Sequence, residues 1–405
     1  MSYSAFVGVD WASRQHAACG LDPAGGRTDK FAIDHSEEGL DQLIARLGRL
    51  GDPAQVLVAI ERPNGIVVDR LLEAGHPVVP LKPAAVNAYR HAIRPSRAKS
   101  DPGDALVIAE YARLTHQQLT PLQPFSDATR ALRASTRTRT QLVRRRVRAT
   151  NQLSAILDAN WPGPRTAFDL DSDIGVAFLR RYPTPESAAH LGPKRLESFL
   201  RRAGYSGGWQ RSPDQILAEL RNAPAGVAGG LLTDGCETVV AAHVNVLAGL
   251  RESIKQLDRV IVDQLSAHPD GVIFSSFPHS GKVNAARLLA EWGDTRQAYP
   301  SPESVAALAG MTPVTRESGE HRAVLFRWAC NKWLRDAMAS FADNSRHGSP
   351  WAAGVYRKAK QGRRSHPHAV RILGRAWIRV MWRCWIDRRP YEATRHGNAR
   401  QLATT

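Results

Sequence analysis

Four carboxylates occupy positions from which a sheet and a neighbouring helix could bind a cation. Asp10 and Glu61 each end an apolar run that is typical of a buried strand. Asp101 and Asp104 are three residues apart at the expected start of a helix, so both fall on one helix face. Such a set predicts a Mg²⁺ site, because this cation prefers oxygen ligands and a pair of such ions can activate one oxygen and stabilise the leaving one.

Three of these acids also have an ordinary structural explanation. Asp10 could lie in a surface turn, Glu61 could pair with Arg62, and Asp101 could cap a helix. The combination favours a metal site, because separate explanations do not account for two strand ends followed by a D-x-x-D pair.

Hydrophobic patterning predicts the elements that would hold these acids. The expected strands cover 5–10, 16–21, 28–33, 55–60 and 76–81, and the expected helices cover 37–50, 66–74, 83–93 and 105–114. A β-rich start followed by alternating strands and helices indicates a mixed α/β sheet.

The rest of the chain is expected to be helical. A long helix over 126–157 carries many arginines and few apolar residues, which is typical of a coiled-coil arm or of a rod that contacts phosphates. A second long helix over 238–265, at the end of the all-helical stretch 165–265, could pair with it. Further helices are expected at 282–292, 301–309, 322–345, 350–361 and 366–387.

Net charge distinguishes these regions. The 405 residues carry a formal charge of +17. Residues 1–90 hold 9 basic and 11 acidic side chains, whereas 91–160 hold 12 and 5, and 266–405 hold 22 and 10. The surplus predicts nucleic-acid contacts in the two basic segments, beside a slightly acidic first one. An arginine-rich composition from a GC-rich genome is the alternative explanation for part of the excess.

The sequence disfavours several other classes of protein. It has no apolar run long enough to span a membrane, and its N-terminus does not read as a secretory signal. The four cysteines are widely spaced without a CxxC pair, which argues against a disulfide framework or a structural zinc site. We therefore expect a protein of the reducing cytoplasm without a membrane partner.

The segments that carry the acids resemble a known family. GVDWAS (8–13), AIERP (59–63) and RAKSDPGDA (97–105) look like the motifs of the DEDD transposases, the bridge-RNA-guided recombinases of bacterial insertion sequences, which are related to the Piv-type DNA invertases. The four acids named above match the metal ligands of that family one for one. The likeness covers about 5–115 and 270–390.

A second matching block, AGMTPVTRESG, places Ser318 at the position of the nucleophile of that family. The resemblance implies that Ser318 attacks a DNA phosphate and leaves a covalent phosphoserine link, which preserves the bond energy for rejoining. Three arginines nearby, Arg316, Arg322 and Arg327, could neutralise the phosphate. The structural alternative is an ordinary Ser-Gly turn before the helix expected at 322.

Other residues are expected to contact nucleic acid. Asn331 and Arg335 match a family pattern. The block FPHSGK (277–282) stands where the family has a Pro-Gly-x-Gly hairpin, but His279 replaces the first glycine and weakens the case for a phosphate cradle there. The polar run 357–364 is a candidate phosphate patch. The full set is Arg137, Arg144, Arg145, Arg146, Lys282, Arg316, Arg322, Arg327, Asn331, Arg335, Arg363 and Arg364.

An aromatic row, which includes Trp377, Met381 and Trp385, lies in the last expected helix among arginines. Base stacking is one interpretation of this row. Residues at this spacing more often belong to a core, so packing is the expected role.

Together with the expected elements, the resemblance implies an architecture of four parts. They are an α/β RuvC-like (RNase H-like) domain over 1–120, a helical coiled-coil region for oligomerisation and RNA contact over 121–268, a mainly α transposase domain with the catalytic serine over 269–392, and a flexible tail over 393–405.

The function that the resemblance implies is that of a transposase that cuts and rejoins DNA through a phosphoserine. Its catalytic residues would be Ser318, Asp10, Glu61, Asp101 and Asp104, with Mg²⁺ or Mn²⁺ as cofactor. The resemblance implies donor and target DNA, a structured guide RNA and a homotetramer as partners, and a bacterial cytoplasmic protein that joins the nucleoid when active. The alternatives are a RuvC-like, metal-dependent endonuclease acting on branched DNA without a covalent step, and a non-catalytic nucleic-acid-binding scaffold.

Overall fold

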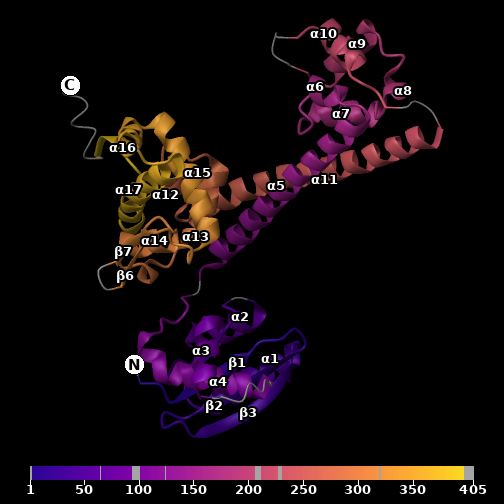
Figure 1. Ribbon diagram of the computed structural model, residues 1–405. Coiled ribbons are helices and arrows are strands. Elements are labelled where there is room, and N and C mark those ends of the chain that lie inside the picture. Colours follow the sequence, from indigo (N-terminus) through magenta and orange to yellow (C-terminus); the bar gives the residue numbers. More distant parts are fainter. Residues whose placement is uncertain are drawn as a thin grey trace. The chain divides into compact units, whose positions relative to one another are not determined.

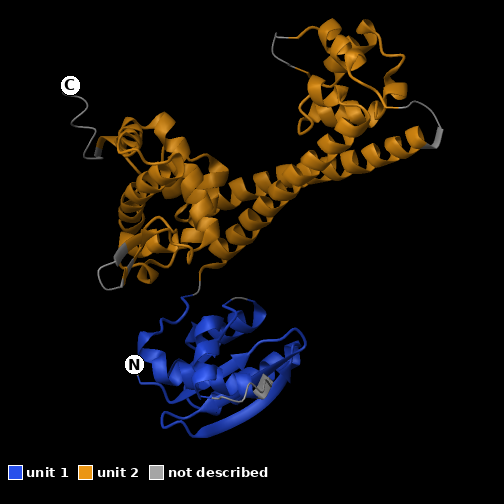
Figure 2. Cartoon of the chain, viewed as in Figure 1, with its two compact units in different colours: residues 1–124 blue, residues 125–405 orange. Residues whose placement is uncertain are grey.

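A computed structural model describes residues 2–63, 65–93, 101–123, 125–205, 211–226, 230–318 and 321–395, except for the side chains of 101, 102, 230, 231, 316, 318, 321, 322 and 395. The chain forms two compact units, Met1–Pro124 and Phe125–Thr405 (Figure 2). Over the described ranges, no helix combines the length and apolarity that crossing a membrane requires.

The first unit is built on a five-stranded mixed sheet in the order β3-β2-β1-β4-β5. β1 is antiparallel to β2, and β2 to β3, whereas β4 is parallel to both β1 and β5. The strands are β1 (Ala5–Asp10), β2 (Gln15–Leu21), β3 (Arg27–Asp34), β4 (Val56–Ile60) and β5 (Val78–Pro80). All five expected strands and the mixed sheet are confirmed.

Helices cover both faces of this sheet. Alternate residues of β1 point to opposite faces, so Val7 packs in the hydrophobic cluster that contains α1 and α2, and Phe6 packs in the cluster that contains α3 and α4. The helices are α1 (Glu37–Gly48), α2 (Ile66–Glu73), α3 (Pro83–Ile93) and α4 (Asp101–Thr115). The result is a three-layer α/β unit.

Two long helices dominate the second unit, α5 (Asp127–Asn160) and α11 (Gly230–Ala267), and they run alongside each other (Figure 1). Leu132 of α5 shares a cluster with Leu265 of α11, whereas Leu153 shares another with Val244. The helix pair is therefore antiparallel.

Each end of the helix pair joins a different hydrophobic cluster. One cluster contains α6 (Gly163–Ala167), α7 (Asp173–Arg181), α9 (Pro193–Arg202) and α10 (Pro213–Asn222), with α8 (Pro185–Ala188) beside them. The other contains α12 (Gly271–Ser275), α13 (Lys282–Trp292), α14 (Pro302–Leu308), α15 (Lys332–Gly348), α16 (Pro350–Gln361) and α17 (His366–Ile386). The start of α5 and the end of α11 are thus part of the core of the C-terminal elements.

The aromatic row of α17 belongs to this core. Trp377, Met381 and Trp385 are fully buried, and Nε1 of Trp377 donates a hydrogen bond of 2.8 Å to Oγ of Ser345. Packing, the expected role, is confirmed, and base stacking on these rings is excluded by their burial.

The helix expected over 322–345 is wrong at its start. Its first residues belong to β7 (His321–Leu325), which forms a hairpin with β6 (Val314–Ser318), and α15 begins at Lys332. β-branched residues such as Thr315 and Val324 pair across the hairpin and favour strands. Asn331 then starts the helix, because its side chain accepts the N–H groups of Trp333 and Leu334.

Candidate functional site

A cleft of about 510 Å³ in the first unit is lined by three of the four predicted acids. Asp10 is the last residue of β1, and Glu61 directly follows β4. Because Val9 pairs with Ile60 across these parallel strands, the two acids leave the sheet side by side. Asp104 reaches the same cleft from the first turn of α4.

Gly8 allows α4 to come close enough for this meeting. A Cβ atom at Gly8 would lie 2.2 Å from the carbonyl oxygen of Ala105 and 2.4 Å from the amide nitrogen of Ala109. The backbone of α4 therefore packs directly on the backbone of β1, and only glycine fits. This close packing sets how near Asp104 lies to the end of the strand that carries Asp10.

Asp104 has a cationic partner inside the cleft. The residue is 7% exposed, and its Oδ1 lies 3.0 Å from Nη2 of Arg90 on α3. A carboxylate this buried needs such a partner. Arg90 also lines the cleft but was not identified from the sequence, where only its place in an expected helix could be read.

The chemistry of the donors fits a hard divalent cation, since carboxylates supply the oxygens that Mg²⁺ and Mn²⁺ prefer. Within the described part of the chain, no three His, Cys, Asp or Glu residues form a ready cluster for a metal ion. Asp101 begins α4, but its side chain and residues 97–100 lie outside the described residues. The acids placed so far are therefore near one another without forming a closed cage.

The residues that follow the two strand-end acids contact each other. The guanidinium of Arg62 lies 4.2 Å from the centre of the Trp11 ring. A cation over an aromatic face at this distance is attracted to it. This contact ties the chain after Asp10 to the chain after Glu61.

The buried His16 also contacts the segment that follows Asp10. Nδ1 of His16 accepts the N–H of Ala12 at 3.2 Å, and Nε2 of His16 lies 2.8 Å from Nδ1 of His35. Because Nδ1 accepts a hydrogen bond, the neutral ring carries its proton on Nε2 and donates it to His35. The pKa of His16 is lowered, first by burial and then by His35.

The lowered pKa of His16 predicts a loss of stability in mild acid. Above pH 6.5 the ring is neutral in both states, but below it the unfolded chain accepts a proton that the folded chain refuses until its lower pKa is reached. At pH 5.5 we expect a loss of at most about 1.4 kcal/mol, the limit for a ring that stays neutral in the folded state. Urea unfolding of His16→Asn, whose Oδ1 can still accept the Ala12 N–H, should lose less stability between pH 7.5 and 5.5.

The exposed His347 supplies the control for this experiment. His347→Asn should keep the pH dependence of the parent protein. An equal loss in the His16→Asn and parent proteins would show that His16 is not the titrating group.

In the second unit, Ser318 ends β6 and pairs with His321 across the hairpin. The side chains of Ser318, Arg316 and Arg322 lie outside the described residues. Arg327 is described, and its Nε donates to the carbonyl of Thr312 at 3.3 Å.

The arginines predicted on α5 differ in their surroundings. Arg137 forms two hydrogen bonds to the buried Glu291, of 2.6 and 2.8 Å, and Nε of Arg146 lies 3.1 Å from Oδ2 of Asp171. Arg144 and Arg145 are exposed. The helix therefore uses part of its positive charge to stabilise its own unit, and the exposed pair remains the best placed for nucleic acid.

Glu291 is a residue that sequence reasoning missed. It is 3% exposed, and besides Arg137 it accepts a hydrogen bond of 2.8 Å from Nδ2 of Asn331. A charged residue inside the apolar end of α13 was the available signal. Asn331, predicted to contact nucleic acid, thus uses its amide in a helix cap and in this buried network.

The remaining predicted residues lie on or near the surface. Lys282, Arg363 and Arg364 are exposed, and Arg335 is half-buried with its guanidinium 5.1 Å from the centre of the Phe326 ring. His279, which replaces a family glycine, has a φ of 54°, the left-handed conformation that glycine adopts readily.

Known proteins are similar to this chain over almost its full length. A family model described as "Transposase", for DEDD transposases of the IS110 type, matches residues 7–162, and one described as "Transposase IS116/IS110/IS902 family" matches residues 272–357. The mini-circle protein of IS117 from Streptomyces coelicolor, whose name describes it as a putative transposase, is 29% identical over 402 residues, 97% of each chain.

Two further relatives come from insertion elements. The 42 kDa protein of IS900 from Mycobacterium paratuberculosis is 28% identical over 96% of this chain and 98% of its own. The 43.6 kDa protein of IS110 from Streptomyces coelicolor is 28% identical over 96% of this chain and 95% of its own. With both matched segments and the strand-end acids in place, the chain belongs to the DEDD transposases of insertion sequences.

Proposed function

We propose that this transposase cuts and rejoins DNA through a phosphoserine at Ser318, assisted by a divalent cation in the acidic cleft. The observation that carries the proposal is the convergence of Asp10, Glu61 and Asp104, from two strands and a helix, on one cleft. Asp101 would complete the set, because it lies on the same helix as Asp104 and three residues before it.

The cleft acids would hold Mg²⁺ or Mn²⁺ through carboxylate oxygens. Arg90 would have to release Oδ1 of Asp104 for that oxygen to bind a cation, so Arg90 would stabilise the cation-free cleft. When bound, the cation would supply positive charge that stabilises the phosphate oxygens during the reaction. Arg62 and Trp11 would keep the two strand ends, and so their acids, in register.

The covalent step is a phosphoryl transfer to Ser318. The hydroxyl of Ser318 gives up its proton, its Oγ bonds to phosphorus, and one P–O bond of the strand breaks, so that a deoxyribose oxygen leaves and takes up a proton. Attack on the phosphoserine by the deoxyribose hydroxyl of another strand reverses these changes and restores the serine. No external energy source is needed, because each P–O bond broken is replaced by one formed.

The wider assignments are also proposals. The strand order 3-2-1-4-5, in which β1, β2 and β3 pair antiparallel and β1, β4 and β5 pair parallel, supports an RNase H-like domain of the RuvC kind over 1–120. The α5–α11 pair supports a coiled-coil region over 121–268, and the second cluster supports a transposase domain over 269–392. A guide RNA, a tetramer and a cytoplasmic, nucleoid-associated location follow from the family resemblance, with the exposed Arg144 and Arg145 as RNA contacts.

Binding of Mn²⁺ to the full chain tests the acidic cleft without requiring activity. Asp10→Asn and Asp104→Asn should each weaken Mn²⁺ binding, measured by calorimetry, by at least about 10-fold, because each removes a charged oxygen ligand. The exposed Glu73, at the end of α2, provides a matched control of equal charge change. Equal Mn²⁺ affinity in Asp10→Asn, Asp104→Asn and Glu73→Gln would contradict a metal site in this cleft and favour a non-catalytic scaffold.

A further inference from the structure

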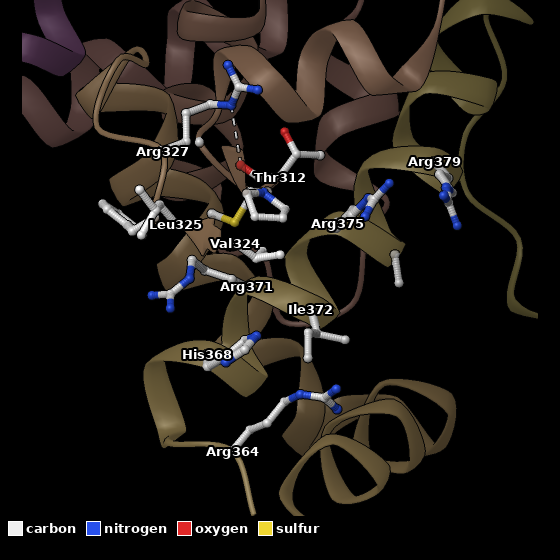
Figure 3. A pocket seen from close by; sticks show the side chains of 15 residues that line it. Thr312, Val324, Leu325, Arg327, Arg364, His368, Arg371, Ile372, Arg375 and Arg379 are labelled. Carbon is white, nitrogen blue, oxygen red and sulfur yellow. Dashed lines mark hydrogen bonds between the residues drawn. The ribbon is translucent and has the colours of Figure 1, made fainter. Parts of the chain in front are cut away.

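A second pocket, of about 560 Å³, lies between the β6–β7 hairpin and α17 (Figure 3). In Figure 3, Arg371, Arg375 and Arg379 extend from α17, and Arg327 lies on the other side of this space beside Thr312. The lining of the pocket includes five arginines, Arg327, Arg364, Arg371, Arg375 and Arg379, and none of its described lining residues is acidic.

Most of this charge is not neutralised by the protein. Arg379 pairs with Glu303 at 3.4 Å, but no ion pair among the described residues includes Arg371 or Arg375. Burial, and then the charge of Arg335, lowers the pKa of Arg371. Nε of Arg375 is shielded from solvent and has no hydrogen-bond partner within the described chain. Like charges gathered without an acid are destabilising unless an anion joins them.

An aromatic side chain organises the cationic groups. The guanidinium groups of Arg335 and Arg371 lie 5.1 and 4.9 Å from the centre of the Phe326 ring. Phe326 thereby holds two cations at a shared surface. The pocket is therefore a shaped arrangement of cations rather than a scatter of surface arginines.

The spacing along α17 suits a polymer of phosphates. Arg371, Arg375 and Arg379 occur every four residues, so they lie on one face about 6 Å apart and span about 12 Å. A DNA strand carries one phosphate per about 3.4 Å of duplex axis, and the row would therefore match about three to four phosphates.

The opposite wall connects the pocket with Ser318. Val324 lines the pocket, and the residue three positions before it in β7, His321, pairs with Ser318. Three strand residues span about 10 Å. Val324 and the nearby Trp328 are 63% and 74% exposed, so apolar surface is available for sugars and bases beside the arginines.

We propose that this arginine pocket binds the sugar–phosphate backbone of the DNA strand next to the phosphate that Ser318 attacks. The inference rests on the proposed role of Ser318. DNA is favoured over RNA as the ligand, because the wall of the pocket is the hairpin that carries this residue. The pocket holds the strand in place, whereas the acidic cleft and Ser318 carry out the chemistry.

Binding of a fluorescent DNA duplex, which contains an element end and its flank, tests this assignment. Arg371→Gln combined with Arg375→Gln should reduce the slope of log affinity against log salt by about 2 and weaken binding at 0.1 M salt by about 10- to 60-fold. The control, Arg201→Gln with Arg202→Gln on exposed positions of α9, should bind as the parent does. Arg371→Lys with Arg375→Lys preserves charge and should retain most of the slope.

The binding assay can contradict the role of the arginine pocket independently of the proposed chemistry. Measured in a Ser318→Ala background, it reports binding whether or not Ser318 is the nucleophile. Parent-like DNA affinity in a folded Gln variant, as judged by circular dichroism, would overturn the pocket assignment. Loss of affinity for a structured RNA of equal length with unchanged DNA affinity would overturn it too, by showing an RNA site. Should the Gln pair not fold, the single variant Arg371→Gln, with an expected slope change of about 1, decides the question.

Discussion

Ser318→Ala should lose DNA strand cutting and the covalent protein–DNA adduct together, each by at least about 10³-fold. A loss of this size is expected because the substitution removes the oxygen that would bond to phosphorus. The other groups of the active site contribute little to the rate once the nucleophile is absent. The measurement uses end-labelled DNA with the element end. A protease-sensitive adduct and a cut strand are scored on a denaturing gel.

Thr315 is a suitable control for this experiment. It is exposed on the same strand as Ser318, and the hairpin uses its backbone for pairing with Val324. Thr315→Ala should cut and form the adduct at close to the parent rate. Cutting by Ser318→Ala without an adduct would instead support the metal-dependent endonuclease, in which the acidic cleft acts on branched DNA alone.

The location of the strand-end acids in the fold could be predicted from the sequence for a simple physical reason. Asp10 and Glu61 follow apolar runs that had to be buried strands, and neighbouring parallel strands end at the same sheet edge. The D-x-x-D spacing similarly put Asp104 on the first turn of a helix. These features depend on local patterns, which a sequence displays directly.

The partners of these acids depend on packing that no local pattern displays. Arg90 contacts Asp104 only because α3 and α4 pack on the same face of the sheet. On α5, Arg137 was predicted to contact nucleic acid, and the structure adds a partner that the sequence did not indicate, Glu291 from a helix far along the chain. The distribution of charge along the sequence thus identified the basic segments, but it did not show which arginines form ion pairs within the protein.

The hairpin shows a second limit. The stretch after residue 322 contains enough apolar residues to suggest a helix. In the structure its first residues form a strand instead, in which Val324 pairs with Thr315 across a short turn. Cross-strand pairing is a contact between two segments, so the hydrophobic pattern of one segment alone does not predict it. This error concealed the wall of the arginine pocket, because Val324 and Leu325 were assigned to the wrong element.

Gly8→Val should disrupt the first unit more than any change of an acid. A Cβ atom at this position would lie 2.2 Å from the carbonyl oxygen of Ala105, and the groups that it would meet most closely are backbone atoms that side-chain rotation cannot relieve. Overpacking of cores commonly costs about 1–3 kcal/mol, and a clash with rigid backbone should exceed that range. We expect a loss of more than about 3 kcal/mol in urea unfolding.

Gly8→Ala separates the role of this contact in the site from its role in stability. Its single methyl group must push α4 outward, and Asp104 moves with α4, so Mn²⁺ affinity should fall even in the fraction that remains folded. Gly48, near the end of α1, has room for a methyl group, since no atom of the described residues beyond its own helix and chain neighbours would lie within 4 Å of a Cβ there. Gly48→Ala should therefore keep both stability and Mn²⁺ affinity. If folded Gly8→Ala bound Mn²⁺ as tightly as Gly48→Ala, the approach of α4 to β1 would matter for folding alone. The acids would then tolerate a shift of the helix that carries Asp104.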